Sequence, residues 1–179
     1  TAKEAYENGV KANFTYFGVD KYADRYLAST NYNRVGTSVS FDHTAEPVDF
    51  EADYKDGYTK EAKKMTYHYP DASKILYKGH KLNDQLTKII TQKYIAGFPN
   101  SLEAWVDIRR TGYPRLFPIL NVADGDGSLK DGDIIRRLPF PDTQDQATLK
   151  DVLSTGMNAL GGVDKQATRL WWDVDKSNF

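Results

Sequence analysis

The chain has 179 residues, of which 40% are hydrophobic, so it can bury a core and suits one domain or part of a larger one. Its net charge is −1, which lacks the positive excess of a general nucleic-acid-binding protein. The absence of cysteine excludes disulfides and thiolate metal sites, and no apolar run approaches the roughly 18 residues of a membrane span.

The beginning of the chain predicts an antiparallel helical hairpin. Apolar side chains recur at helical spacing over residues 2–17, and Gly18 is the expected stop. Asp20 is a candidate cap for a second short helix over residues 21–30. Because the chain starts "TAKEAYENGVKANF", without Met and within a predicted helix, we expect a piece of a longer protein.

Residues 31–81 lose this periodicity and mix Gly, Pro, Asp and aromatic residues. The stretch "TSVSF" at 37–41 permits a strand or a hairpin. A connection of this length is either a functional contact surface or a solvated linker, and both interpretations stay open.

Periodicity returns in a second helical hairpin. An apolar stripe begins at Leu82 and ends before Gly97, and Asn100 with Glu103 resembles a capping box that opens a helix closed by Gly112. Residues 117–145 read as loop, and residues 147–162 predict a last helix that stops at Gly161. The expected fold is mainly α, a tetratricopeptide-like scaffold with long irregular loops and room for a short β-hairpin.

Motifs of metal and cofactor chemistry are missing. "DGDGSLKDGDII" at 124–135 has Leu129 where a calcium loop needs Gly and Ile135 where it needs Glu. A non-standard site is the alternative to a solvated turn, with these candidate ligands: Asp124, Asp126, Asp131 and Asp133. The histidines His43, His68 and His80 lack zinc-ligand spacing. We therefore expect no metal and no cofactor.

Catalytic residues are not evident either. Glu103 and Asp107 lie four apart on one predicted helix and could act as acid and base, but ion pairing with Arg110 is favoured. A glycan-cleaving enzyme needs two carboxylates in a shared cleft, and no specific pair is offered. We expect a protein that is not an enzyme.

Three motifs in order resemble the C-terminal third of the SusD/RagB family. They are "KIITQKYIAGFPNSLEAWVDIRRTGYPRL", "IIRRLPFP" and "NALGGVDKQATRLWWD". The resemblance implies a surface-exposed outer-membrane lipoprotein that binds an oligosaccharide or another small nutrient beside a SusC-like, TonB-dependent transporter. It also implies that residues 1–179 are one region of a larger SusD-like domain, with membrane contact only through a lipid anchor outside this chain. No nucleic-acid partner is expected.

The ligand-binding candidates are Tyr54 and Tyr58, near Asp53 and Lys55, because the apolar face of a sugar ring stacks on aromatic side chains. Ordinary surface or core packing is the alternative for these tyrosines. The alternative function is a helical-repeat protein-interaction module without a small-molecule ligand.

The closing motif "TRLWWD" raises a separate expectation. Adjacent side chains diverge on a helix and on a strand, so Trp171 and Trp172 cannot form one platform, and we expect both to be largely buried. The resemblance implies a structural role for this motif and for the paired arginines, with guanidinium groups bound to carboxylates or carbonyls. These are Arg109, Arg110, Arg136 and Arg137, while Arg169 is expected to help Trp171 and Trp172 hold the end of the chain on the helices.

Overall fold

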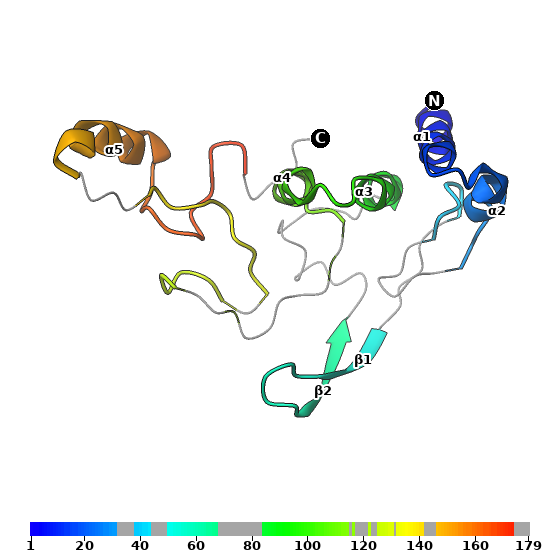
Figure 1. Cartoon of the computed structure of the whole chain (residues 1–179), viewed down its shortest axis with the longest axis horizontal. Helices are drawn as coiled ribbons and strands as arrows, with labels where there is room; N and C mark the ends of the chain where they lie inside the picture. The colour runs from blue at the N-terminus through cyan, green and yellow to red at the C-terminus, as the bar shows by residue number, and fades with distance from the viewer. Residues whose placement is uncertain are drawn as a thin grey trace. The chain divides into compact units, whose positions relative to one another are not determined.

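The computed structural model describes residues 1–31, 38–43, 50–67, 84–114, 116, 122, 125–130, 132–141 and 146–173. It divides into two compact units, residues 1–116 and residues 117–177. The described part is mainly helical, as the sequence predicts, with one two-stranded sheet (Figure 1). None of its helices combines the length and apolarity that a membrane crossing requires.

The first helix, α1 (Ala2–Tyr16), is one residue shorter than predicted. Thr1 and Glu4 form a capping box: the Thr1 hydroxyl accepts from the Glu4 backbone N–H at 3.3 Å, and the Glu4 carboxylate accepts from the Thr1 N-terminus at 2.6 Å. After Tyr16 the chain turns at Gly18, whose φ of +68° suits glycine.

The second helix departs from the prediction. Asp20 is not its cap but the first residue of the 3₁₀ turn η1 (Asp20–Tyr22), whose N-cap Val19 offers no capping side chain. Only α2 (Ala23–Leu27) is α-helical. Without a side-chain cap to start an α-helix, the chain enters a tighter turn first.

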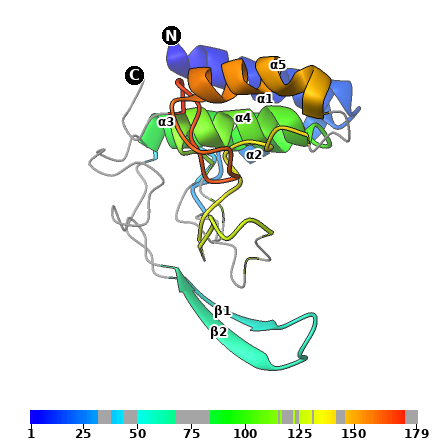
Figure 2. The same cartoon turned by 90° about the vertical axis from the view of Figure 1, so that its left-hand side faces the viewer.

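The core of the first unit is aromatic. Tyr6 and Val10 of α1 meet Phe41, and the Tyr6 and Phe41 rings lie 5.3 Å apart between centroids. Partly buried side chains complete the cluster: Phe14, Tyr26, Leu27 and Ile89. The cluster thus joins α1 to α2 and to α3 (Asp84–Ala96), and Figure 2 shows α1 and α3 from the side.

The loop 38–43 is fixed at several points, and the strand that "TSVSF" permitted is not formed by its described residues 38–41. The Tyr6 hydroxyl donates to the Val39 carbonyl at 2.6 Å. Lys88 of α3 is buried and donates to the Ser38 hydroxyl at 3.3 Å and to the carbonyls of Ser40 and His43. These bonds hold the Phe41 ring in the core.

The permitted β-hairpin exists but lies further along the chain. Strands β1 (Phe50–Lys55) and β2 (Ala62–Tyr67) pair antiparallel, in a register that runs from Phe50 opposite Tyr67 to Lys55 opposite Ala62 (Figure 2). Part of the segment predicted as irregular is therefore regular.

The second predicted helical hairpin is present as α3 and α4 (Ser101–Thr111). The Asn100 side chain accepts from the Glu103 N–H at 3.4 Å, which is one half of the predicted capping box, and Gly112 ends α4 at a φ of +75°. Lys93 links the two helices by ion pairs with Glu103 at 2.8 Å and Asp107 at 2.7 Å. Leu82 lies outside the described residues.

The second unit contains α5 (Gln146–Leu160), which ends before Gly161 at a φ of +68° as predicted. Its loops are joined by carboxylates. Asp173 has no exposed surface and binds Arg136 at 3.1 Å and Arg169 at 2.8 Å. Asp164 binds Arg137 and accepts from the backbone N–H of Phe140 at 3.1 Å.

The expectation for the tryptophans is wrong for Trp171, which is 88% exposed, while Trp172 is partly buried. The physical reason lies one residue on: the carboxylate of Asp173 reaches two guanidinium groups and holds the segment instead. The pairing predicted for Arg136 and Arg137 is confirmed, and Arg169 is paired with Asp173 as well.

The arginines of α4 are also paired. Arg110 binds Asp107 at 2.9 Å. Buried Arg109 places its guanidinium 3.6 Å from the centroid of the Trp105 ring and donates to the Trp105 carbonyl at 3.4 Å. Such planar stacking is characteristic of arginine.

Candidate functional site

The two candidate tyrosines belong to the β-hairpin. Tyr54 lies on β1, opposite Lys63, and its side chain is outside the described part. Tyr58 lies in the connecting turn and is 97% exposed. Asp53 and Lys55 are exposed as well. The structure thus places both tyrosines on one hairpin, one in a strand and one at its tip.

The backbone that carries Tyr58 is fixed by Asp56. One carboxylate oxygen of Asp56 accepts from the backbone N–H groups of Tyr58 at 2.8 Å and Thr59 at 2.9 Å. These two bonds lower the pKa of the Asp56 carboxyl, and the bond from Thr59 has the largest effect. The nearby Lys63 lowers it further. A free aromatic ring on a pinned turn is suited to stacking against a sugar ring.

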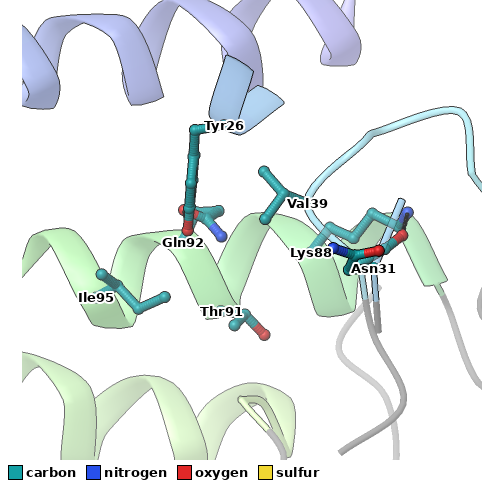
Figure 3. Close-up of a pocket in the computed structure, with 8 residues that line it drawn as sticks. Tyr26, Asn31, Val39, Lys88, Thr91, Gln92 and Ile95 are labelled. Atoms are coloured by element: carbon teal, nitrogen blue, oxygen red, sulfur yellow. Dashed lines mark hydrogen bonds between the residues drawn. The ribbon is translucent and has the colours of Figure 1, made fainter. Parts of the chain in front are cut away.

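A pocket of about 240 Å³ opens between α2, the loop at 38–39 and α3 (Figure 3). Its described lining combines apolar surface with hydroxyl and amide groups. The lining residues are Tyr26, Asn31, Ser38, Val39, Lys88, Thr91, Gln92 and Ile95. In Figure 3 the Tyr26 side chain reaches from α2 toward Gln92 of α3, and its hydroxyl donates to the Gln92 side-chain oxygen at 3.1 Å.

The lining of this pocket combines neutral polar groups with one buried cation, Lys88, whose ammonium already donates to Ser38, Ser40 and His43. Hydroxyl and amide groups can exchange hydrogen bonds with the hydroxyls of a sugar, while Val39 and Ile95 supply apolar surface. The described lining contains no carboxylate, so it offers no acid–base pair. The volume lies below the roughly 300–1,000 Å³ that is typical of small-molecule pockets.

The two carboxylates of α4 serve in ion pairs. Lys93 bridges Glu103 and Asp107. Both carboxylates raise the pKa of the Lys93 ammonium, and Asp107 has the larger effect. Asp107 is buried and also binds Arg110. The ion pairing expected between Asp107 and Arg110 is confirmed.

The acidic loop is a structural turn where it is described. Asp126 accepts from the backbone N–H of Ser128 at 3.0 Å and of Gln166 at 2.8 Å, and Asp133 accepts from that of Lys130 at 2.9 Å. Asp124 and Asp131 lie outside the described residues. Within the described ranges, no group of three His, Asp or Glu side chains could hold a metal ion.

His43 is the histidine that the structure describes, and its ring takes part in a side-chain contact. The His43 Nδ1 lies 3.0 Å from the Ser38 hydroxyl, beside buried Lys88. His68 and His80 lie outside the described part of the chain. His43 therefore belongs to the hydrogen bonds that fix the loop 38–43.

A family model described as "SusD-like: Susd and RagB outer membrane lipoprotein" matches residues 1–173. This chain belongs to the SusD-like family. The match extends the resemblance of the three C-terminal motifs to nearly the whole chain. The family is one of outer-membrane lipoproteins.

Solved structures of SusD homologues agree. The chain is 35% identical to a chitin-binding SusD homologue from Flavobacterium johnsoniae, with a TM-score of 0.67, over 100% of this chain and 33% of that one. A SusD homologue from Parabacteroides distasonis is 30% identical with a TM-score of 0.68, over 99% of this chain and 29% of that one.

A third SusD homologue, from Bacteroides vulgatus, is 36% identical with a TM-score of 0.63, over 99% of this chain and 31% of that one. The SusD-like chain thus spans about a third of the length of these relatives. Among curated proteins none matches it.

Sequence reasoning did not find the pocket. Tyr26 and Gln92 are 66 positions apart, and each was explained as part of its own helix, so no local pattern joined them. The sequence did contain a sign of the role of Asp173, because this residue closes the motif "TRLWWD", which also contains an arginine. The anchoring role was assigned to the two tryptophans of that motif instead.

Proposed function

We propose that this SusD-like chain serves in a non-catalytic protein that binds an oligosaccharide or similar small nutrient at the cell surface. It would deliver that ligand to a SusC-like, TonB-dependent transporter. The single observation that carries the proposal is the 35% identity, over the whole chain, to a chitin-binding SusD homologue. In this proposal residues 1–179 form one region of a larger SusD-like domain, with the lipid anchor elsewhere.

Two features support this proposal: an exposed aromatic ring and a net charge close to zero. The Tyr58 ring stands free on a turn that Asp56 fixes, and we propose it, with Tyr54, as a stacking contact for the ligand. The net charge of −1 gives little electrostatic attraction, so a neutral glycan is the fitting class. The pocket beside Tyr26 and Gln92 is a second place where one sugar unit could bind.

Titration calorimetry of the whole protein with neutral oligosaccharides, chitin fragments included, tests the proposal. We expect dissociation constants in about the micromolar to millimolar range. They should change little between low and high salt, because stacking is hardly screened. Product formation would make the protein an enzyme, and steep salt dependence would indicate a charged ligand.

Two variants locate the site. The double substitution Tyr54→Ala and Tyr58→Ala should weaken binding about tenfold, which corresponds to about 1.4 kcal/mol of lost stacking. Tyr16→Ala, at another exposed tyrosine, is the matched control and should bind as the parent does. If the double variant binds normally while Gln92→Ala does not, the pocket is the site and the hairpin tyrosines are excluded.

A helical-repeat module that binds only proteins is the alternative function, favoured by exposed apolar side chains on α4 such as Leu102. It predicts no heat of binding with any glycan of the panel.

A further inference from the structure

Lys60, in the turn between β1 and β2, has a left-handed backbone. Its φ is +63°, a region that glycine adopts freely and that a residue with a Cβ adopts only against a steric penalty. Gly57, in the same turn, shows the reverse, because its φ lies outside the left-handed region and a Cβ added there would meet no atom within 4 Å. The turn thus has glycine where a side chain would fit and lysine where glycine would be favoured.

The stability of the turn does not explain the lysine. The Lys60 ammonium donates to the Gly57 carbonyl at 2.6 Å, but both residues are exposed, and a hydrogen bond open to water contributes little to stability. The turn is closed by backbone bonds of 2.9 Å, from the Lys60 N–H to the Asp56 carbonyl and from the Asp56 N–H to the Glu61 carbonyl. A strained backbone without a local benefit is a reason to look for a function.

The bond to Gly57 places the ammonium next to Tyr58. The Gly57 carbonyl and the Tyr58 N–H belong to one peptide group, whose N–H donates to Asp56 at 2.8 Å and whose carbonyl accepts from Lys60. The Asp56 carboxylate is also paired with Lys63, at 3.4 Å. Within the described residues Lys60 forms no ion pair and uses one of its three N–H donors, so two of them can reach a ligand.

We propose that Lys60 is a ligand-binding residue of the hairpin, which donates to an oxygen atom of a neutral sugar unit whose apolar face stacks on Tyr58. A sugar ring needs both kinds of contact, because it has an apolar face and hydroxyl groups at its rim. Tyr58 supplies the first contact, and the ammonium held at the adjacent peptide group supplies the second. The inference rests on the proposed function and adds a requirement to it: the ligand presents an oxygen acceptor beside the stacked face.

Titration calorimetry of the whole protein with the same panel of neutral oligosaccharides, chitin fragments included, tests this residue. Lys60→Met removes the donors and keeps a long side chain, and it should weaken binding about fivefold, as the loss of one exposed hydrogen bond does. Lys60→Gly should weaken binding as much. Lys64→Met, the matched control, removes an equal charge from β2 and should bind as the parent does.

Hydrogen exchange in the turn separates a binding role from a structural one. In Lys60→Gly the backbone amides of residues 56–61 should exchange no faster than in the parent, because glycine adopts the left-handed backbone without strain. If Lys60→Gly accelerates exchange and weakens binding together, the lysine stabilises the turn through its bond to Gly57 and the inference is wrong.

Acylation of the lysines gives an independent measurement. In the whole protein without ligand, Lys60 should be acylated about as fast as exposed Lys64, and a saturating oligosaccharide should slow the acylation of Lys60 alone. Slow acylation of Lys60 before any ligand is added would mean that another part of the polypeptide, within or beyond these 179 residues, covers the turn, and would overturn the inference.

The calorimetry also distinguishes failure of this inference from failure of the proposed function. A parent that binds an oligosaccharide, with Lys60→Met binding it equally well, would overturn the role of Lys60 and leave the proposed function intact. A parent that binds no member of the panel would refute both.

Discussion

Each of the two units is stabilised internally by a different kind of interaction. In residues 1–116 an aromatic cluster around Tyr6 and Phe41 joins α1, α2 and α3, and most of its contacts are non-directional. In residues 117–177 two carboxylates, Asp164 and Asp173, gather arginines and backbone N–H groups from distant loops. Both arrangements fix long loops, but the second depends on geometry and charge.

The difference teaches where each unit is vulnerable. An apolar core tolerates volume-conserving changes and loses stability in proportion to the volume removed. A buried ion pair tolerates almost no change at either partner, because the remaining charge is left without compensation in a region of low polarity. Substitutions and changes of pH should therefore affect the stability of the two units differently.

The largest effect is expected at Asp173. Asp173→Ala leaves buried Arg136 without its carboxylate and should cost about 3–5 kcal/mol of unfolding free energy in the second unit. Hydrogen exchange should show faster exchange in peptides from residues 132–173 and little change in residues 1–31. Equal destabilisation of both units would show that they unfold as one and would break the comparison.

Phe41→Ala should destabilise the first unit by about 3 kcal/mol, at the lower end for a phenylalanine, because several neighbours are only partly buried and can close the cavity. Phe41→Leu, the matched control, should cost less. Denaturant melts followed by tyrosine fluorescence measure both. A loss that varies strongly with salt would contradict an apolar origin.

A smaller effect is expected at Asp164. Burial alone would raise its pKa, but the bonds from Arg137 and the Phe140 N–H outweigh that, so the pKa lies below the ordinary value. A lowered pKa adds stability above about pH 4 that is lost as the pH falls through the folded-state pKa. Asp164→Asn should lower the unfolding free energy by about 2 kcal/mol at neutral pH and make the loss of stability at acidic pH, the acid limb, less steep. An unchanged acid limb in the variant would assign the acid sensitivity to other carboxylates.

The smallest effect is expected at Trp171. The side chain is 88% exposed, so Trp171→Ala should change the unfolding free energy by no more than about 0.5 kcal/mol. Trp172→Ala, at the partly buried neighbour, should cost more. A loss of several kcal/mol at Trp171 would restore the anchoring role that the sequence suggested.

Local patterns predicted where three helices end, but not the 3₁₀ turn that comes before α2. Gly18, Gly112 and Gly161 mark the ends of α1, α4 and α5 because their backbone φ is positive, a feature that glycine in the sequence announces. The hairpin could be allowed but not located, since strands of six residues leave short and ambiguous patterns. The fold class and the family followed from motifs that stand in order along the chain.

The candidate site depended on contacts that no local pattern contains. Tyr26 meets Gln92, and Lys88 meets the loop at 38–43, across separations of about 45 residues or more. Such pairings arise from packing of elements, which periodicity does not specify. Tyr58 is different: it was singled out as an aromatic residue that can stack on a sugar ring, without any prediction of the turn that carries it.

The buried Lys88 has a consequence for chemical reactivity. Amine-directed acylating reagents attack the uncharged, accessible amine, and the Lys88 ammonium is enclosed by α3 and the loop, where it donates to the Ser40 and His43 carbonyls. Acylation of Lys88 therefore requires the loop to come away from the helix, whereas exposed Lys60 and Lys64 react directly. The rate of Lys88 acylation relative to that of the exposed lysines, measured by mass spectrometry, therefore reports how often the first unit opens.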